Sequence, residues 1–171
     1  MNLSFKKCSI EDLDVLMKIS KETFVEAFQS QNNPEDFKRY IEEAFSKKSV
    51  KQQLLNSDSH FYFTYLNNAL VGYFKLNENK AQNEPFKNAI ELERIYVIKD
   101  FQGQKIGKDM LEKAISISKS KKGDFLWLGV WEHNTSAIRF YERYDFKKFD
   151  EHSFYLGKDQ QTDWLMKLNF V

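Results

Sequence analysis

The sequence has one cysteine, two prolines and three histidines among its 171 residues, and these shortages exclude several kinds of site. Cys8 has no second cysteine with which to form an internal disulfide, and the scattered histidines do not give the Cys/His spacing of a structural zinc site. No apolar run approaches the roughly 18 residues of a membrane span, and the first residues lack the apolar core of a signal peptide. We therefore expect a cytoplasmic protein with no metal site and no membrane partner.

The sequence also has almost no excess of positive over negative charge. The chain has 26 Lys and Arg against 25 Asp and Glu, a net charge of +1, so no overall field attracts nucleic acid or an anionic membrane. The lysines between residues 105 and 119 are interrupted by Asp109 and Glu112, which is typical of a solvated helix face. We expect no nucleic-acid partner, because a nucleic-acid regulator requires a salt-dependent affinity that this balance disfavours.

The length fits one domain spanning residues 1–171, since about 150 residues already bury roughly 70% of the surface that the unfolded chain exposes. Changes in hydrophobic period predict the order strand, helices, three strands, helix, strand, helix and two strands, which indicates a single-domain α/β (α+β) fold. We expect strands at residues 3–8, 60–66, 70–76, 89–98, 125–131, 146–156 and 162–170, and helices at residues 10–29, 34–45, 50–55, 106–117 and 134–144.

Polar residues mark several of these boundaries. Ser9 with Asp12 resembles a capping box, and Asn33 before Pro34 predicts an N-cap followed by proline at the first helical position. The pair at residues 67–68 is Asn-Asn, which predicts a tight hairpin turn because asparagine tolerates positive φ.

The stretch YVIKDFQGQKIGKDM, residues 96–110, passes from an apolar strand through a glycine-spaced turn into a helix. Such a turn presents unpaired backbone N–H groups and the positive end of the helix dipole, so it can bind an anion. Pyrophosphate suits the amides of residues 103–108, and Lys105 and Lys108 can add cationic contacts. The alternative is a surface turn in which Gly103 and Gly107 only relieve backbone strain. Neither a Walker sequence nor a GxGxxG fingerprint is present.

Two motifs carry a family resemblance. The segment QGQKIG, residues 102–107, resembles the (Q/R)xxGx(G/A) pyrophosphate loop of the GCN5-related N-acetyltransferase (GNAT) family. The segment NTSAIRFY, residues 134–141, resembles the NxxAxxFY motif of the same family. Further stretches, including PEDFKRYIEEAFS, ELERIYV and WLGVWEHN, are similar to bacterial spermidine/spermine N-acetyltransferases, and this likeness spans nearly the whole chain.

The resemblance implies a GNAT-like fold, with a mixed, mostly antiparallel sheet flanked by helices. It also implies transfer of acetyl from acetyl-CoA to a primary amine, spermidine or spermine first, in a ternary complex. Cys8 lacks a partner base in the sequence, so we expect no thiol intermediate. The alternatives are another amine, such as a peptide N-terminus or a small metabolite, and a non-catalytic CoA-binding regulatory module. We expect a monomer or a homodimer.

The same resemblance assigns roles to individual residues. Tyr141 is expected to donate a proton to the departing thiolate, and Glu93, with Glu91 in reserve, to act as the base that the protonated amine requires. Without the resemblance, Tyr141 is a core residue and the two glutamates are paired strand carboxylates. Residues implied in cofactor binding are Ile95, Tyr96 and Val97 by their backbone, the loop residues Gln102, Gly103, Gln104, Lys105, Ile106, Gly107 and Lys108, and Asn134 and Arg143 beyond them.

Two positions depart from the family pattern, because Lys105 and Asp145 stand where glycine is usual. We expect the Lys105 amide to face the anion if its φ is helical, with the side chain pointing outward. We expect Asp145 to be tolerated because aspartate reaches positive φ readily.

The family usually shapes its acceptor pocket from the N-terminal helices and the loop at residues 80–88. A cationic acceptor predicts carboxylates there, each of which can instead be an ordinary surface charge. The candidates are the acidic Glu26, Glu35, Glu42, Glu84 and Glu132, and the aromatic Phe24, Phe28, Tyr40, Trp131 and Phe154.

Overall fold

Seven strands form one sheet in the order β1-β2-β3-β4-β5-β7-β6 in the computed structural model, which describes residues 2–170. β4 and β5 run parallel, and the other neighbouring strands run antiparallel. The strands are β1 (Leu3–Lys7), β2 (Ser59–Leu66), β3 (Ala69–Glu78), β4 (Ala89–Val97), β5 (Phe125–Trp131), β6 (Lys147–Leu156) and β7 (Asp159–Asn169). The expected mixed, mostly antiparallel sheet is confirmed.

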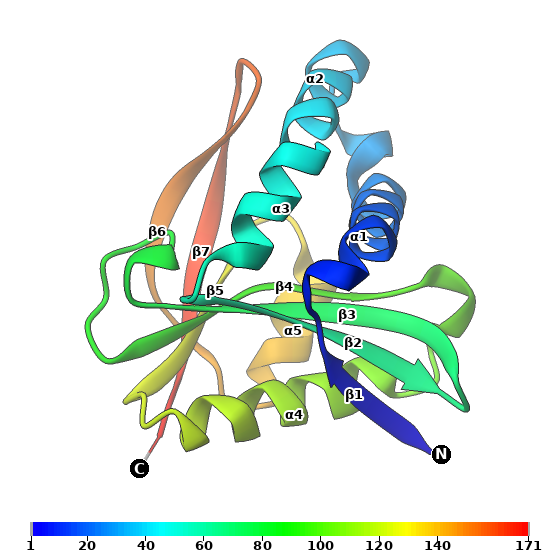
Figure 1. Cartoon of the computed structure of the whole chain (residues 1–171). Coiled ribbons are helices and arrows are strands. Elements are labelled where there is room, and N and C mark those ends of the chain that lie inside the picture. Colours follow the sequence, from blue (N-terminus) through cyan, green and yellow to red (C-terminus); the bar gives the residue numbers. More distant parts are fainter. Residues whose placement is uncertain (1, 171) are drawn as a thin grey trace.

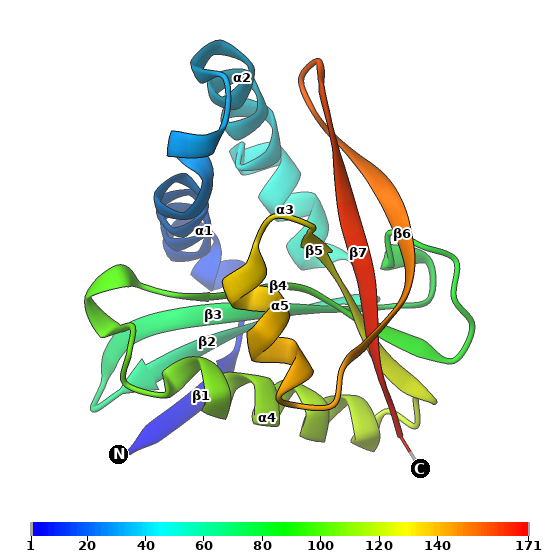
Figure 2. The ribbon, with the colours of Figure 1, turned by 180° about the vertical axis from the view of Figure 1, so that it is seen from behind.

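Helices cover both faces of this sheet (Figures 1 and 2). They are α1 (Leu13–Phe28), α2 (Pro34–Ala44), α3 (Lys47–Leu55), α4 (Ile106–Ser120) and α5 (Thr135–Glu142). Leu16 of α1 packs with Phe63 on one face, and Met110 of α4 packs with Phe74 on the other. The apolar residues of α4 that are buried are Ile106, Met110, Leu111 and Ala114.

The polar boundary signals act as predicted. The Asn33 side chain accepts from the amides of Glu35 and Asp36 at 3.0 and 3.2 Å. The hairpin turn between β2 and β3 has positive φ at both central asparagines, 48° and 70°. The Asp12 carboxylate accepts from the Ser9 amide at 2.9 Å, although the turn that it caps is a short 3₁₀ helix, η1 (Ile10–Asp12), before α1.

Several boundaries differ from the prediction by two or three residues, among them the starts of α3 and β7. α3 begins at Lys47, three residues before the expected start, because the Ser46 hydroxyl accepts from the Ser49 amide at 3.1 Å and caps the helix. β7 begins at Asp159 rather than at residue 162, because Gly157, with φ of 62°, allows β6 to turn directly into β7. The β6–β7 hairpin is consequently longer than predicted.

The parting of β4 from β5 is the feature that creates the site. Their pairing ends at Glu91 and Trp127, although β4 continues beside β3 to Val97. On β4, Arg94 lies opposite Lys75 and Leu92 opposite Leu76, so Glu93 between them is the extra residue of a β-bulge. A bulge bends the strand that contains it. This bend falls two residues after the last β4–β5 pair.

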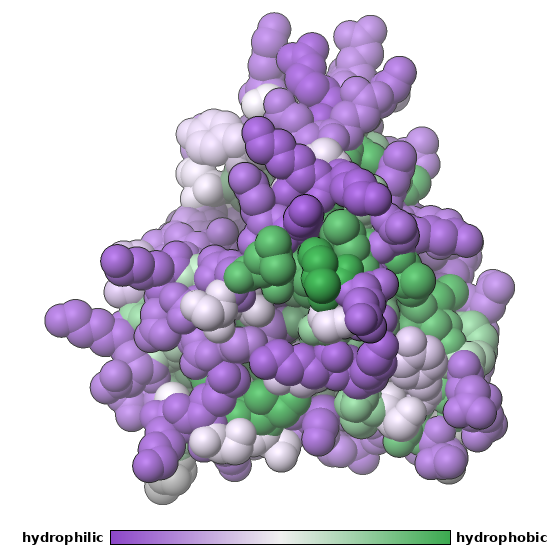
Figure 3. All heavy atoms as spheres, in the orientation of Figure 1, coloured by the Kyte–Doolittle hydropathy of each residue, from purple (hydrophilic) through white to green (hydrophobic). Residues whose placement is uncertain are grey.

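Polar side chains cover most of the face seen in Figure 3, with a small apolar area near its centre. Within residues 2–170, no helix is long and apolar enough to cross a membrane.

Candidate active site

Two adjoining cavities open where β4 and β5 part. The acidic cavity has a volume of about 520 Å³, and the loop cavity, beside the β4–α4 turn, has a volume of about 1000 Å³. Residues that line both cavities include Ile95, Tyr96, Asn134 and Tyr141. The two cavities therefore meet beside the unpaired half of β4 and the start of α5.

The loop cavity gathers the residues that the sequence assigns to cofactor binding. All of them except Gln104 line it, namely Ile95, Tyr96, Val97, Gln102, Gly103, Lys105, Ile106, Gly107, Lys108, Asn134 and Arg143. Gln104 is exposed and does not line either cavity. Segments from β4, the following turn and α5 thus meet around one space.

The backbone of the turn contradicts one expectation. Lys105 has φ of 65°, in the left-handed region, and not the helical φ on which we based its contact with an anion. The residue is exposed, and it also lines the loop cavity. Its carbonyl accepts the Lys108 amide at 3.0 Å, so that amide is already used within the turn. The amides expected to face an anion are therefore those before Lys108.

Asp145 also occupies the left-handed region, with φ of 63°, as expected for its replacement of glycine. The turn that it forms lets the Phe146 amide donate to the Tyr141 carbonyl at 3.2 Å. This contact closes the end of α5 and fixes the tyrosine-bearing turn.

Gln102 connects the turn to β4. Its Nε2 donates to the Val97 carbonyl at 3.0 Å. This contact anchors the turn, and it occupies one backbone group of the segment that the sequence assigns to cofactor binding.

Tyr141 lies at the junction of the two cavities. Its side chain projects from α5, and the residue is 9% exposed. Burial raises the pKa of the phenol, which consequently stays protonated at neutral pH. A protonated hydroxyl at this junction can donate a proton to a group bound in either cavity.

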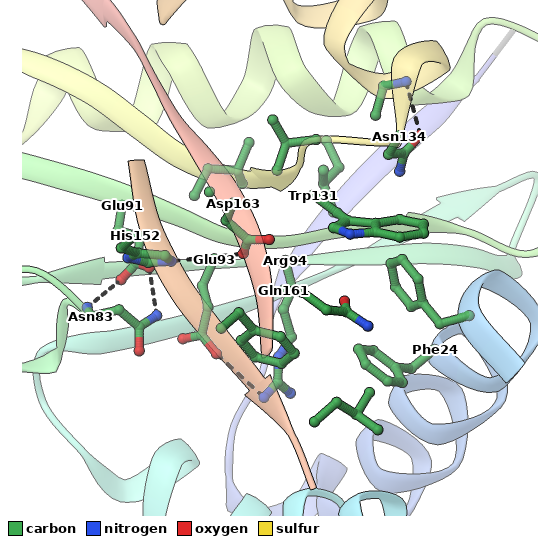
Figure 4. Close-up of a pocket in the computed structure, with 18 of the residues that line it drawn as sticks. Phe24, Asn83, Glu91, Glu93, Arg94, Trp131, Asn134, His152, Gln161 and Asp163 are labelled. Atoms are coloured by element: carbon green, nitrogen blue, oxygen red, sulfur yellow. Dashed lines mark hydrogen bonds and ion pairs between the residues drawn. The ribbon is translucent and has the colours of Figure 1, made fainter. Parts of the chain in front are cut away.

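The acidic cavity has a charged end and an aromatic end (Figure 4). Its carboxylates are Glu84, Glu91, Glu93 and Asp163. Its aromatic side chains include the five that the sequence suggested: Phe24, Phe28, Tyr40, Trp131 and Phe154. The structure therefore brings the predicted aromatic wall together.

Glu91 and Glu93 are held in different surroundings. Burial and the charge of Glu93 raise the pKa of Glu91, whose carboxylate accepts from the Asn83 amide and side chain at 2.9 and 2.6 Å. Burial alone would raise the pKa of Glu93 as well, but the charges of Arg94 and Lys75 hold it below its usual value. Asn77 Nδ2 donates to both carboxylates, at 3.1 and 2.5 Å. The two glutamates thus reach the same side of β4, as expected.

The sequence predicted the acidic residues of the cavities less well than the aromatic ones. Glu84 lines the acidic cavity and Glu26 the loop cavity, whereas Glu35, Glu42 and Glu132 line neither. In the acidic cavity, the charged residues that the sequence did not indicate are Arg94, His152 and Asp163.

His152 of β6 lies opposite Asp163 of β7 and contacts Glu84 of the β3–β4 loop. Its Nδ1 is 2.7 Å from Glu84 Oε1, and its Nε2 is 3.7 Å from Asp163 Oδ2. The Asp163 carboxylate is the main reason that the pKa of His152 rises to about 9. The β6–β7 hairpin and the β3–β4 loop bring these residues together, so no local sequence signal reveals the cluster.

Two further kinds of reactive group, a metal site and a thiol, can be judged within residues 2–170. No group of three His, Cys, Asp or Glu side chains in this part of the chain could hold a metal ion. Burial raises the pKa of the Cys8 thiol to about 12, so it is not a nucleophile at neutral pH.

Comparison with known proteins identifies the family. Residues 14–146 match the acetyltransferase (GNAT) family. An uncharacterized N-acetyltransferase in the pepI 3' region of Lactobacillus delbrueckii subsp. lactis is 39% identical over 164 residues, which cover 95% of this chain and 95% of that protein. The spermidine N(1)-acetyltransferase of Thermoplasma acidophilum is 27% identical over 154 residues, 88% of this chain and 91% of the relative.

A solved structure supports the same assignment. The PaiA N-acetyltransferase of Thermoplasma acidophilum in complex with coenzyme A superposes with a TM-score of 0.79 at 25% identity, covering 99% of this chain and 100% of that one. The chain therefore belongs to the acetyltransferase (GNAT) family and is an N-acetyltransferase that uses acetyl-CoA as its acetyl donor.

Proposed function

We propose that the protein acetylates a primary amine of a polyamine, spermidine or spermine, by direct transfer between the two cavities. Acetyl-CoA binds in the loop cavity and the amine in the acidic cavity. The observation that carries this assignment is the meeting of the two cavities at Tyr141, beside the unpaired half of β4. At that meeting point an acetyl group and an amine can come into contact.

The residues of the loop cavity fit the donor. The β5-facing edge of β4 is unpaired after Glu91, so Ile95, Tyr96 and Val97 can bond the amides of the pantetheine arm as a neighbouring strand would. A Cβ atom built at Gly107 meets its nearest neighbour, Val97 Cγ2, at 3.9 Å. The added atom would thus make only an ordinary contact, and the loop cavity lies beside this start of α4, where main-chain amides and the helix dipole attract a diphosphate. Asn134 and Arg143 complete this cavity from α5 and its end.

Acetyl-CoA supplies an activated acetyl group: a carbon–nitrogen bond forms to the amine as the thioester carbon–sulfur bond breaks and the sulfur departs as a thiolate. Tyr141 gives its proton to that sulfur and later regains one from water. Because a thiol has a pKa near 8.5 and its thiolate leaves readily, the help that Tyr141 gives is moderate.

The amine must lose a proton before it can attack. An alkyl ammonium group has a pKa near 10.4, so at neutral pH a base has to take that proton. Glu93, with Glu91 beside it, lines the acidic cavity and can receive the proton through a water molecule. The proton that Glu93 receives passes on to solvent, which balances the reaction.

The acidic cavity suits an elongated cation. Carboxylates at one end attract ammonium groups, and the aromatic wall can cover the methylene segments between them. Two relatives named for these amines support the same acceptor: the spermidine N(1)-acetyltransferase of Thermoplasma acidophilum and a probable spermine N(1)-acetyltransferase of Bacillus subtilis subsp. natto.

Another primary amine, such as a peptide N-terminus or a small metabolite, is the second candidate acceptor. Arg94 and His152 also line the acidic cavity, and as cations they offset part of its negative charge. An amine with fewer positive charges depends less on the negative charge of the cavity than spermine does, so the offset weakens its binding less.

Steady-state acetylation of an amine panel tests the proposal. The panel contains spermidine, spermine, a monoamine and a peptide with a free N-terminus, assayed with wild type and with Tyr141→Phe. We expect the largest kcat/KM with the polyamines and a fall in kcat on the order of 10²-fold in Tyr141→Phe, at the low end of general acid effects. Transfer to the monoamine or the peptide but to neither polyamine would reject the polyamine acceptor.

A further inference from the structure

Lys75 is a charged side chain enclosed between the sheet and α3. It lies on β3, is 4% exposed and lines neither cavity. Its Nζ donates to Gln53 Oε1 of α3 at 2.8 Å and to the Glu93 carboxylate, and it lies 5.2 Å from the centre of the Phe61 ring. Of these neighbours, Glu93 carries the negative charge.

Stability alone does not explain an ammonium at this position. Removing a charge from water costs several kcal/mol, and replacing a buried ion pair by apolar residues of similar volume is often neutral or stabilising. Burial lowers the pKa of Lys75, and the charge of Glu93 opposes that effect. The interaction with Glu93 is therefore the reason to look for a role in the reaction.

The contacts of Glu93 leave part of its carboxylate free. Oε2 accepts from Lys75 and from Asn77, and Oε1 lies 3.3 Å from Arg94 Nη2. A carboxylate has about four acceptor positions, so about one remains, on Oε1. The side chain is 20% exposed and lines the acidic cavity, where an amine or a water molecule can use that position.

Several titratable groups from three elements act on Glu93. They are Lys75 and Tyr73 of β3, Glu91 and Arg94 of β4, and Tyr40 of α2. Two of these are cations, and one is a carboxylate whose own pKa is raised by burial. Lys75 is the cation that contacts Glu93 from outside the cavity, so its charge does not stand in the path of the amine.

We propose that Lys75 is a positioning residue that keeps Glu93 ionised and holds Oε2, so that the free position of Oε1 faces the acceptor amine. This inference rests on the proposed function, in which Glu93 receives the proton of the amine through water. The ammonium of Lys75 itself touches neither substrate.

Two measurements on Lys75→Met test the proposal. The first is the pH dependence of kcat/KM for the best amine of the panel, and the second is a ¹³C NMR titration of the Glu93 carboxyl in the free protein. Burial raises the pKa of Glu93, and without the charge of Lys75 less opposes that rise. The midpoint of the NMR titration and the acid limb of the kcat/KM profile should therefore both move up by about one pH unit or more.

Matched variants separate charge from packing. Gln53→Leu removes the second hydrogen bond of Lys75 but leaves its charge beside Glu93, so the midpoint should stay where it is in wild type. Lys75→Arg keeps the charge and should restore most of the wild-type profile. If Lys75→Met does not fold, Lys75→Gln serves instead, because it is neutral and can still donate to the carboxylate.

The outcomes distinguish this inference from the proposed function. Unchanged Glu93 titration in the neutral variant, with acetyl transfer intact in wild type, overturns the role of Lys75 and leaves the proposed function standing. A shifted titration without acetyl transfer to any amine by wild type overturns the proposed function and leaves the control of Glu93 ionisation standing. An equal shift in Gln53→Leu assigns the effect to packing and overturns the inference.

Discussion

At the scale of single residues, the turn before α4 places a lysine in a backbone conformation that favours glycine. Lys105 has φ of 65°. The left-handed region costs a residue with a Cβ atom roughly 1–2 kcal/mol, because Cβ approaches the following carbonyl oxygen. Asp145 has a similar φ, but a short polar side chain makes this conformation less costly. Of these two residues, Lys105 therefore carries the greater strain.

Lys105→Gly should stabilise the protein. We expect the free energy of unfolding to rise by about 0.5–1 kcal/mol, because the strain that is relieved exceeds the entropy that glycine adds to the unfolded chain. Urea unfolding followed by circular dichroism measures the change.

A matched lysine in the same segment provides the control. Lys108 lies within the right-handed turn of α4, so Lys108→Gly should lower the free energy of unfolding by about 1 kcal/mol. Destabilisation by both substitutions would show that the left-handed conformation of Lys105 is not strained.

At the scale of elements, the first turn of α4 contains a glycine that lines the loop cavity. Gly107 has a right-handed backbone, so the local conformation does not require glycine. A Cβ atom there has no neighbour closer than 3.9 Å. Glycine at this position is explained if a bound group approaches the main chain.

Gly107→Ala should therefore separate folding from donor binding. Alanine favours the helix, so the free energy of unfolding should rise by up to about 1 kcal/mol. The added methyl group obstructs the diphosphate, so KM for acetyl-CoA should rise by about tenfold, equivalent to about 1.4 kcal/mol. Thermal unfolding and steady-state kinetics measure the two effects.

Ser116→Ala is the control on the same helix. Ser116 is exposed and does not line either cavity, so its replacement should stabilise α4 slightly and leave KM unchanged. An unchanged KM in Gly107→Ala would place the diphosphate away from the start of α4.

At the scale of the whole molecule, His152 joins the two halves of the parted sheet. It lies on β6, which belongs to the β5 side, and it contacts Glu84 of the loop that leads into β4. The carboxylate of Asp163, and then that of Glu84, favours the charged imidazole and raises the pKa of His152 to about 9. The imidazole consequently carries a positive charge at neutral pH.

Stability should depend on this histidine in a defined pH window. Because the pKa of His152 rises from 6.5 to about 9 on folding, its contribution is complete below about pH 6.5 and is lost as the pH rises through 9. Compared with His152→Gln, wild type should be more stable by about 1–3 kcal/mol at pH 6, and the difference should shrink by pH 10. Urea unfolding of both proteins from pH 6 to 10 provides the test; a difference that grows with pH contradicts the assignment.

The elements and the glycine-spaced turn could be predicted because their signals are local. Caps such as Asn33, turn residues such as Asn67 and the glycine-spaced turn each depend on neighbours in sequence. The bulge at Glu93 could not be predicted, because it is defined only by its register against Lys75 and Leu76. Lys75 and His152 look like surface residues in a linear reading, and their contacts arise only when distant strands pair.

A strand edge without a hydrogen-bonded partner also affects whether copies of a protein associate. A bare strand edge on a protein surface can template pairing with another chain and lead to aggregation. The bare edge of β4 instead lines the two cavities, with α5 nearby in Figure 2. The opening that admits a slender substrate arm in the proposed function is thereby kept from the strands of neighbouring molecules, so unpaired backbone groups there do not promote aggregation.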